Sequence, residues 1–172
     1  MALLNHSPES GHLEPDAAVS VGGKAEPDAA DHQYPKADAV HILMLNHEYP
    51  PLGGGAGRVT AEIATELIAT GHRVTVVTTR CGALPSHEMF GGIDIHRVYS
   101  KRRSPLQNDL PFTMPSYLLL GAAKAHQLAG RISFDVIHAF FTIPGGLIGS
   151  WLSHRTGVPL VVSLHGADVP HH

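Results

Sequence analysis

From residue 40 onward, short apolar runs alternate with longer segments in which apolar residues recur every three or four positions. The first run, VHILMLN (40–46), is nearly all apolar, which is typical of a strand buried on both faces of a sheet. Three further runs predict strands, and the last two are expected to be buried: HRVTVVTTR (72–80), FDVIHAF (134–140) and PLVVSLHG (159–166). A more polar run, GGIDIHRVYS (91–100), predicts a weaker strand at an edge of the sheet.

The segments between these runs predict helices. Residues 58–71 have one apolar stripe at helical spacing, and Gly71 stands where a helix commonly ends. The stripe consists of Val59, Ile63, Ala64, Leu67 and Ile68. A second helix is predicted over 116–131, with Pro115 in its first turn, and a third within 145–157, closed by Gly157.

Strands that alternate with helices predict parallel strands joined by right-handed crossovers. We therefore predict an α/β fold in which residues 39–172 form a single domain, a Rossmann-like doubly wound parallel sheet with helices on both faces. Residues 1–38 contain few large apolar side chains and repeat EPDAA. This composition predicts a disordered low-complexity tail, and a segment that binds a partner is the alternative.

Charge and composition narrow the function classes. The chain of 172 residues has a net charge of −3, which gives no overall attraction to nucleic acid. Its single cysteine excludes an internal disulfide, and we expect neither a secretory signal nor a membrane-spanning segment, hence a cytoplasmic protein. The 14 histidines do not form a metal motif such as H-E-x-x-H, and the lone cysteine offers no thiolate cluster, so we predict no metal ion.

In open parallel sheets, ligands bind beyond the carboxyl ends of the strands. The first predicted strand is followed there by EYPPLGGGAGR (48–58), which leads into a helix. Free backbone N–H groups and the helix dipole favour an anion at such a position, and glycines let a phosphate approach the backbone closely. We predict a phosphate site at this loop; a connecting turn without a ligand is the alternative.

Two familiar nucleotide motifs do not fit this loop. The motif G-x-x-x-x-G-K-[ST] is absent, which argues against a P-loop NTPase. The motif G-x-G-x-x-G would need a glycine where Arg58 stands, and Thr79 and Arg80 replace the acidic residue expected after the second strand. A nicotinamide dehydrogenase is therefore disfavoured, although an arginine at that place would suit the 2′-phosphate of NADPH.

Four short motifs occur in a specific order: P-x-x-G-G-G (50–55), GH-x-V-x-V-x-T (71–78), FDVIHA (134–139) and HGAD (165–168). Together they resemble the N-terminal domain of family 4 glycosyltransferases, over about residues 40–170. The resemblance implies the GT-B fold, in which two Rossmann-like domains face each other across a cleft. It also implies metal-independent transfer of a sugar from a nucleotide-sugar donor to a glycan, lipid or small-molecule acceptor, with retention of the anomeric configuration.

The resemblance further implies roles for the donor side of the cleft. Gly54 and Gly55 match the loop that approaches the donor diphosphate. His165 matches the histidine beside the transferred sugar, with Asp168 nearby, and these two are the predicted catalytic residues. Arg58 either adds positive charge to the phosphate site or is a solvated helix residue.

On the acceptor side we predict His138, Thr142, Lys101 and Arg102. His138 lies inside an apolar strand, where a satisfied core histidine is the alternative, and Phe140 stands where the family often has a second histidine. The basic cluster KRRSP (101–105) precedes apolar residues and would suit an anionic lipid surface, which implies peripheral contact with the inner face of the membrane. A solvated loop beside an amphipathic helix is the alternative.

The family has a second domain that supplies most donor contacts, and no segment of this chain matches it. We therefore expect the fragment alone to be inactive, with the second domain supplied in trans if the chain is half of a split enzyme. A truncated gene product and an isolated domain remain alternatives. Two other classes stay open: a non-catalytic Rossmann-like binding module or partner subunit, and a dinucleotide-dependent oxidoreductase.

Overall fold

The computed structural model of the chain describes residues 38–100 and 110–168. The predicted tail of residues 1–38 therefore lies outside the described residues, except for Asp38, and its disorder stays a prediction.

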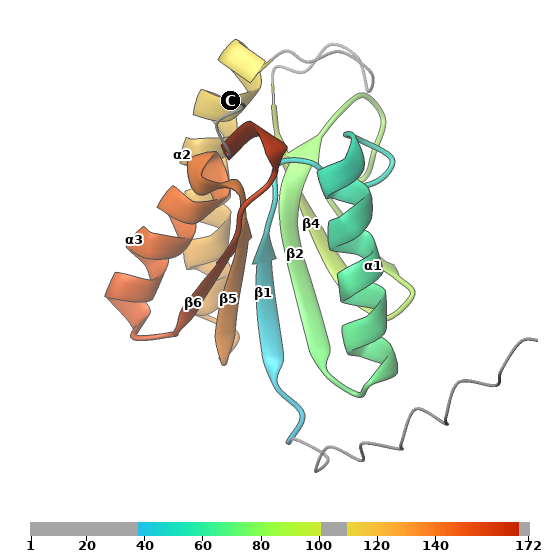
Figure 1. The fold of residues 1–172 in the computed structure, drawn as a ribbon, viewed down its shortest axis with the longest axis vertical. Helices are drawn as coiled ribbons and strands as arrows, with labels where there is room; N and C mark the ends of the chain where they lie inside the picture. Colours follow the sequence, from blue (N-terminus) through green and yellow to red (C-terminus); the bar gives the residue numbers. More distant parts are fainter. Residues whose placement is uncertain (1–37, 101–109, 169–172) are drawn as a thin grey trace, which may run out of the picture. The chain divides into compact units, whose positions relative to one another are not determined.

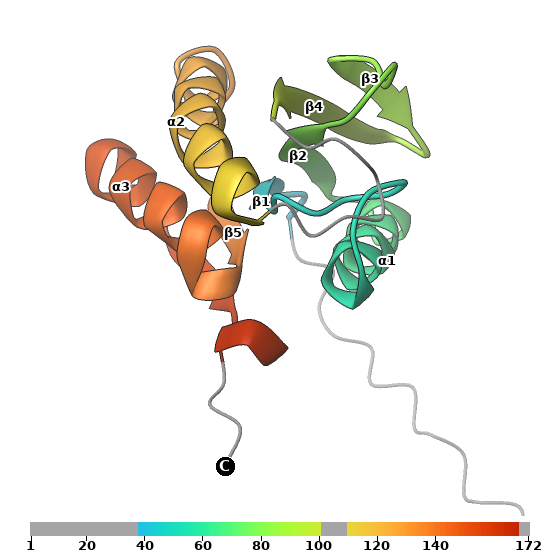
Figure 2. The same cartoon turned by 90° about the horizontal axis from the view of Figure 1, so that it is seen from above.

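The described residues form one six-stranded sheet in the order β3-β4-β2-β1-β5-β6. Figure 1 shows β4, β2, β1, β5 and β6 in this order, and Figure 2 shows β3 next to β4. The strands are β1 (His41–Leu45), β2 (Arg73–Arg80), β3 (His87–Phe90), β4 (Ile93–Tyr99), β5 (Val136–Phe140) and β6 (Leu160–Ser163). All neighbouring strands pair in parallel except β3 and β4, which are antiparallel. The central strand β1 is buried along its whole length, as its continuous apolar run predicts.

Helices cover both faces of this sheet. They are α1 (Gly55–Ala69), α2 (Leu110–Ala129) and α3 (Leu147–Thr156), with the short helices η1 (Phe141–Gly146) and η2 (Gly166–Asp168). Figure 2 shows α2 and α3 on one side of the sheet and α1 on the other. The predicted Rossmann-like, doubly wound α/β fold is therefore confirmed. Gly71 and Gly157 follow α1 and α3 with positive φ, as predicted for helix ends.

The core consists of two apolar layers, one on each face of the sheet. Alternating strand residues feed the two layers: Leu43 and Leu45 point to the side of α2 and α3, whereas Ile42 and Met44 point to the side of α1. In the first layer, Tyr117 of α2 is fully buried, and its hydroxyl donates a hydrogen bond to the carbonyl of Val77 at 2.7 Å. Burial raises the pKa of this hydroxyl, which keeps it protonated.

The predicted edge position of residues 91–100 is wrong. A hairpin precedes β4, so that β3 is the edge strand and β4 lies between β3 and β2. Gly91 and Gly92 form its two-residue turn, both with positive φ, which is the backbone that tight hairpins require. The sequence analysis missed β3 because HEMF (87–90) is mostly exposed and has no apolar pattern.

The second helix begins earlier than predicted, since α2 starts at Leu110 rather than at residue 116. Pro115 therefore lies inside the helix and not in its first turn. Proline has no N–H group to donate, so the carbonyl one turn earlier loses its helical partner at this point.

The predicted burial of residues 159–166 is also wrong, and Val59 of the predicted apolar stripe is exposed. Among the described residues β6 is an edge strand, and Val161 and Val162 are 51% and 38% exposed. On α1 the buried residues are Gly57, Thr60 and Ala64, while Val59 is exposed. The close approach of Gly57 to the preceding loop sets this rotation of the helix, because a side chain there would meet the Leu52 carbonyl at 3.1 Å.

Within the described residues, no helix is both long and apolar enough to span a membrane.

Candidate functional site

The segments that follow β1, β5 and β6 meet at one edge of the sheet, because these three strands pair in parallel. Ring contacts link all three segments. His47, after β1, lies 5.1 Å from the ring of Phe141, after β5, and Phe141 lies 5.0 Å from the ring of His165, after β6. The structure thus brings together the loops that carry most of the predicted site residues.

Buried side chains and hydrogen bonds anchor the loop that follows β1. Tyr49 and Leu52 bury their side chains and the Leu52 N–H donates to the Tyr49 carbonyl at 2.8 Å. Asn46 donates to the Thr60 hydroxyl of α1 at 2.7 Å. Arg97 of β4, itself buried, donates to the carbonyl of Pro50 at 2.9 Å. These contacts order a loop whose glycines would otherwise make it costly to order.

The glycines of this loop differ in what surrounds them. Gly53 has a φ of 96°, a conformation that favours glycine. Gly54 is the N-cap of α1, and the helix begins at Gly55, earlier in the glycine run than predicted. A side chain added at Gly54 or Gly55 would meet no atom within 4 Å. The backbone at the start of α1 is therefore open to an approaching ligand.

Glu48 is a site residue that the sequence analysis missed. Its carboxylate oxygen Oε2 accepts a hydrogen bond from the Gly54 N–H at 3.2 Å. A negative charge thus already lies at the N-terminus of α1, the position predicted to attract a phosphate. The only signal in the sequence was an acidic residue between the first strand and the glycine run.

Arg58 faces solvent. Its side chain is 83% exposed, and its Nε lies 3.0 Å from Oε1 of Glu62, one turn further along α1. This surface ion pair contributes little to stability, so the guanidinium can exchange partners at small cost.

Asp168 connects the loops that follow β5 and β6. Its Oδ1 accepts a hydrogen bond from the Thr142 N–H and its Oδ2 accepts one from the His165 N–H, both at 3.1 Å. Partial burial alone would raise the pKa of Asp168, but these hydrogen bonds outweigh it and lower the pKa. The carboxylate is thus held in its charged form between two predicted site residues.

The imidazole of His165 lies against two phenylalanines. Its ring stacks on Phe140 at 5.7 Å and tilts against Phe141 at 5.0 Å. Phe141 has a φ of 66°, an uncommon conformation for a residue with a side chain. The Nε2 atom of His165 is buried and has no hydrogen-bond partner among the described residues. A buried polar atom of this kind calls for a partner from outside the described part of the chain.

His138 is half-buried and interacts within the sheet. Its Nε2 lies 2.8 Å from the Ser163 hydroxyl of β6, and its ring stacks on Phe140. Burial lowers the pKa of His138, and the charge of His165 lowers it further. Thr142 is exposed at the start of η1, whereas Lys101 and Arg102 lie outside the described residues.

We expect the two glycines at the start of α1 to respond oppositely to alanine. Gly55→Ala should raise the free energy of unfolding by up to about 1 kcal/mol, because the position is helical and has open space. Gly57→Ala should lower it by about 1–3 kcal/mol, because the methyl group would press on the Leu52 and Glu48 backbone. Urea denaturation measures both values, and equal effects of the two substitutions would contradict this description of the loop.

The lowered pKa of His138 predicts a pH-dependent stability. The unfolded chain binds this proton near pH 6.5, whereas the folded chain binds it only at lower pH. The free energy of unfolding should therefore fall as the pH drops below about 6.5. His138→Gln removes this titration and should make the fall between about pH 7.5 and about pH 5 less steep, as measured by urea denaturation. Equal slopes for both proteins would exclude a lowered pKa.

Comparison with known proteins identifies relatives of this chain. The model of the glycosyl transferase 4-like domain family matches residues 54–172. An N-acetyl-alpha-D-glucosaminyl L-malate synthase from Bacillus anthracis is 28% identical over 125 residues, which cover 70% of this chain and 30% of that protein. A D-inositol 3-phosphate glycosyltransferase from Acidothermus cellulolyticus is 32% identical over 132 residues, which cover 74% of this chain and 29% of that protein. The chain thus spans less than a third of the length of these curated relatives.

Solved structures show the same fold. Sucrose-phosphate synthase from Thermosynechococcus elongatus superposes with a TM-score of 0.55 at 19% identity, over 74% of this chain and 33% of that chain. The family match and the shared fold confirm the resemblance noted from the sequence motifs. The chain belongs to the family of glycosyl transferase 4-like domains, as a Rossmann-like N-terminal domain of the GT-B type.

Proposed function

We propose that this domain forms the acceptor-side half of the cleft of a retaining glycosyltransferase. The enzyme would transfer a sugar from a nucleotide-sugar donor to a glycan, lipid or small-molecule acceptor. One observation carries the proposal: the open N-terminus of α1 and the Nε2 of His165, which has no partner in the described part of the chain, belong to loops at the same end of the parallel strands, linked through His47 and Phe141.

The donor diphosphate would bind at the start of α1. Gly54 and Gly55 leave open space around their backbone, and the N-terminal end of a helix attracts negative charge. Arg58 is exposed and near enough in sequence to add a positive charge by leaving Glu62. A bound diphosphate would have to displace the Glu48 carboxylate from the Gly54 N–H.

The transferred sugar would lie by His165, whose buried Nε2 needs a partner. Asp168 holds the backbone of His165 and Thr142 and would position both toward the sugar. In a front-face displacement, the bond between the sugar C1 and the diphosphate oxygen breaks while the acceptor oxygen bonds to C1. The acceptor proton passes to the leaving diphosphate, whose growing negative charge the α1 amides would stabilise. This scheme requires no metal ion or cofactor.

On the acceptor side we propose Thr142, which is exposed and bonded through its N–H to Asp168, and His138, which is half-buried beside Ser163. Lys101 and Arg102 complete this assignment from the sequence alone. The names of the related glycosyltransferases contain different substrates, so we propose only a class of acceptor for this chain.

The complete active site would need a second domain. The region shared with the curated relatives is 30% or less of their length. The edge strand β6 and the adjoining α3 expose large apolar side chains, which further protein would cover in a complete enzyme. They include Leu147, Trp151, Val161, Val162 and Leu164. We therefore propose that the chain alone is inactive and gains activity from a second domain, supplied in trans or by fusion. The other candidate is a partner subunit without catalytic activity.

Glu48→Gln should tighten the binding of a nucleoside diphosphate such as UDP by about fivefold, because it removes a negative charge from the N-terminus of α1. Calorimetric titration of the full chain measures the dissociation constants. Glu66→Gln, which changes the net charge equally but lies further along α1, is the matched control. If both variants bind UDP equally more tightly, the cause is the change in net charge and not the position of Glu48. If Glu48→Gln does not bind UDP more tightly, Glu48 does not compete with the diphosphate.

His165→Ala should abolish sugar transfer by a reconstituted enzyme, with a loss of at least about 100-fold, since it removes the group beside the sugar. The assay mixes the chain with the C-terminal domain of a related glycosyltransferase and detects the product from UDP-sugars by mass spectrometry. His154→Ala, on the exposed surface of α3, serves as the control.

Activity in the mixture but not in the chain alone would support the split enzyme. UDP binding without transfer by any mixture would favour the non-catalytic subunit. Binding of NADPH in place of UDP would overturn the assignment to glycosyl transfer.

A further inference from the structure

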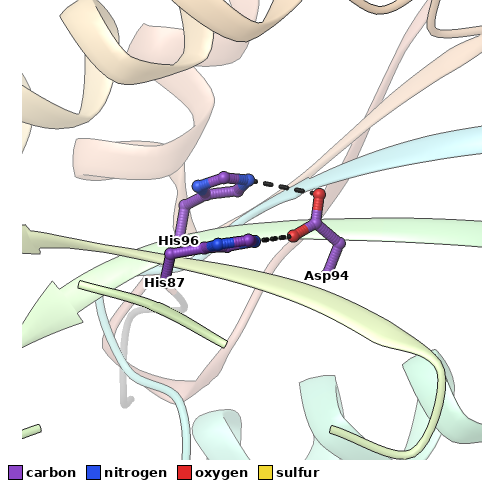
Figure 3. Close-up of side chains that lie close together, drawn as sticks. All are labelled: His87, Asp94 and His96. Carbon is purple, nitrogen blue, oxygen red and sulfur yellow. Dashed lines mark hydrogen bonds and ion pairs between the residues drawn. The ribbon is translucent and has the colours of Figure 1, made fainter. Parts of the chain in front are cut away.

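Two histidines and an aspartate form a compact group at the β3–β4 hairpin (Figure 3). The Nε2 atom of His87 lies 2.7 Å from Oδ1 of Asp94, and the Nε2 atom of His96 lies 3.2 Å from Oδ2 of the same carboxylate. One ligand atom from each residue lies within 4.8 Å of the others. These are donor types that bind Zn²⁺ and other divalent transition metals.

The hairpin itself produces this arrangement. His87 and His96 are directly opposite each other in the antiparallel register, and Asp94 precedes His96 by two positions, which puts it on the same face. The two imidazole rings stack with centroids 4.5 Å apart at 14°, and both Nε2 atoms point toward Asp94 (Figure 3). Ligands of a tetrahedral zinc ion lie about 3.3 Å from one another, given bond lengths of about 2.0 Å. Small movements of the side chains would therefore suffice to place an ion between them.

The group of three side chains is buried on its inner side and open to solvent on its outer side. The side chains of His96 and Asp94 are 14% and 24% exposed, while that of His87 is 55% exposed. Behind the group, the Thr75 hydroxyl lies 3.5 Å from Oδ2 of Asp94 and 2.9 Å from Nε2 of His41. The Asp94 carboxylate thus has a hydrogen-bond partner on the neighbouring strand β2, and a partner of this kind commonly orients a metal ligand. Water can reach the remaining coordination position from the His87 side.

We propose that His87, Asp94 and His96 bind a divalent transition metal ion, with zinc as the expected ion and water as the additional ligand. The ion fastens the edge strand β3 to β4. Asp94 pairs with Thr75 near the start of β2, so the site lies toward the opposite end of the strands from the loops assigned to sugar transfer. Its role is structural, and it is independent of the proposed glycosyl transfer.

A positive charge on α2 opposes the binding of a metal ion at this group. Burial lowers the pKa of His96, and the positive charge of Lys124 on α2 lowers it further; this cation would repel a metal ion. Its Nζ donates to Oε1 of Gln127 at 2.8 Å, which holds it along the helix. The proposal therefore predicts that Lys124→Gln strengthens metal binding.

The test is a titration of the full metal-free chain with Co²⁺, followed by competition with Zn²⁺, in which visible absorption reports four-coordinate cobalt. We expect one equivalent to bind, and we expect His87→Ala to weaken binding by about 100-fold. His87 is exposed, so this variant should fold, and the thermal unfolding of the metal-free variant verifies this. His154→Ala, which removes an exposed histidine of α3, controls for binding by other histidines of the chain.

A second readout is the thermal unfolding temperature, which zinc should raise in the wild type and in His154→Ala but not in His87→Ala or Asp94→Asn. Equal cobalt spectra and affinities in His87→Ala and His154→Ala would overturn the proposal. So would a wild-type chain that shows no cobalt spectrum, because the group would then be a hydrogen-bonded cluster without a metal.

Discussion

Parallel pairing of β1 with β5 and of β5 with β6 is the constraint on which the candidate site depends. It brings three loops, separated by up to about 120 residues of chain, to one edge of the sheet. The aromatic contacts of Phe141 with His47 and His165 then join these loops. Asp168 adds a second connection through its hydrogen bonds to Thr142 and His165. The site thus depends on the register of the sheet more than on any single motif.

The Glu48 carboxylate occupies the N-terminus of α1, which is the position proposed for the donor diphosphate. The helix N-terminus attracts an anion, and the Glu48 carboxylate lies there as an anion from the chain itself. Under the proposed function a donor diphosphate would replace this internal anion, so that binding at the loop would be an exchange of negative charges. Hydrogen bonds from Arg97 to the Pro50 carbonyl and from Asn46 to the Thr60 hydroxyl hold the loop in place.

The two proposed sites lie toward opposite ends of the strands. The carboxyl ends carry the loops of the proposed transferase cleft, whereas the β3–β4 hairpin carries His87 on β3 and Asp94 and His96 on β4, toward the opposite end of the strands. Stabilising the edge strand there protects the flank of the sheet, because unpaired strand edges are prone to mispairing. The other flank, β6, exposes Val161 and Val162, where we propose that the rest of the enzyme packs.

The sequence alone determined the fold class, the strands whose following loops carry the candidate site, and the family. Apolar periodicity and short motifs suffice for these because they are local signals. Gly71 and Gly157 at helix ends were predicted for the same reason. The position of β3, the buried face of α1 and the exposure of β6 came only from the tertiary structure, since pairing and packing between distant segments decide them. The same holds for Glu48 at the Gly54 N–H and for the histidines of the hairpin. Their contacts depend on how strands and loops pair in space, and the spacing of residues along the chain does not reveal this pairing.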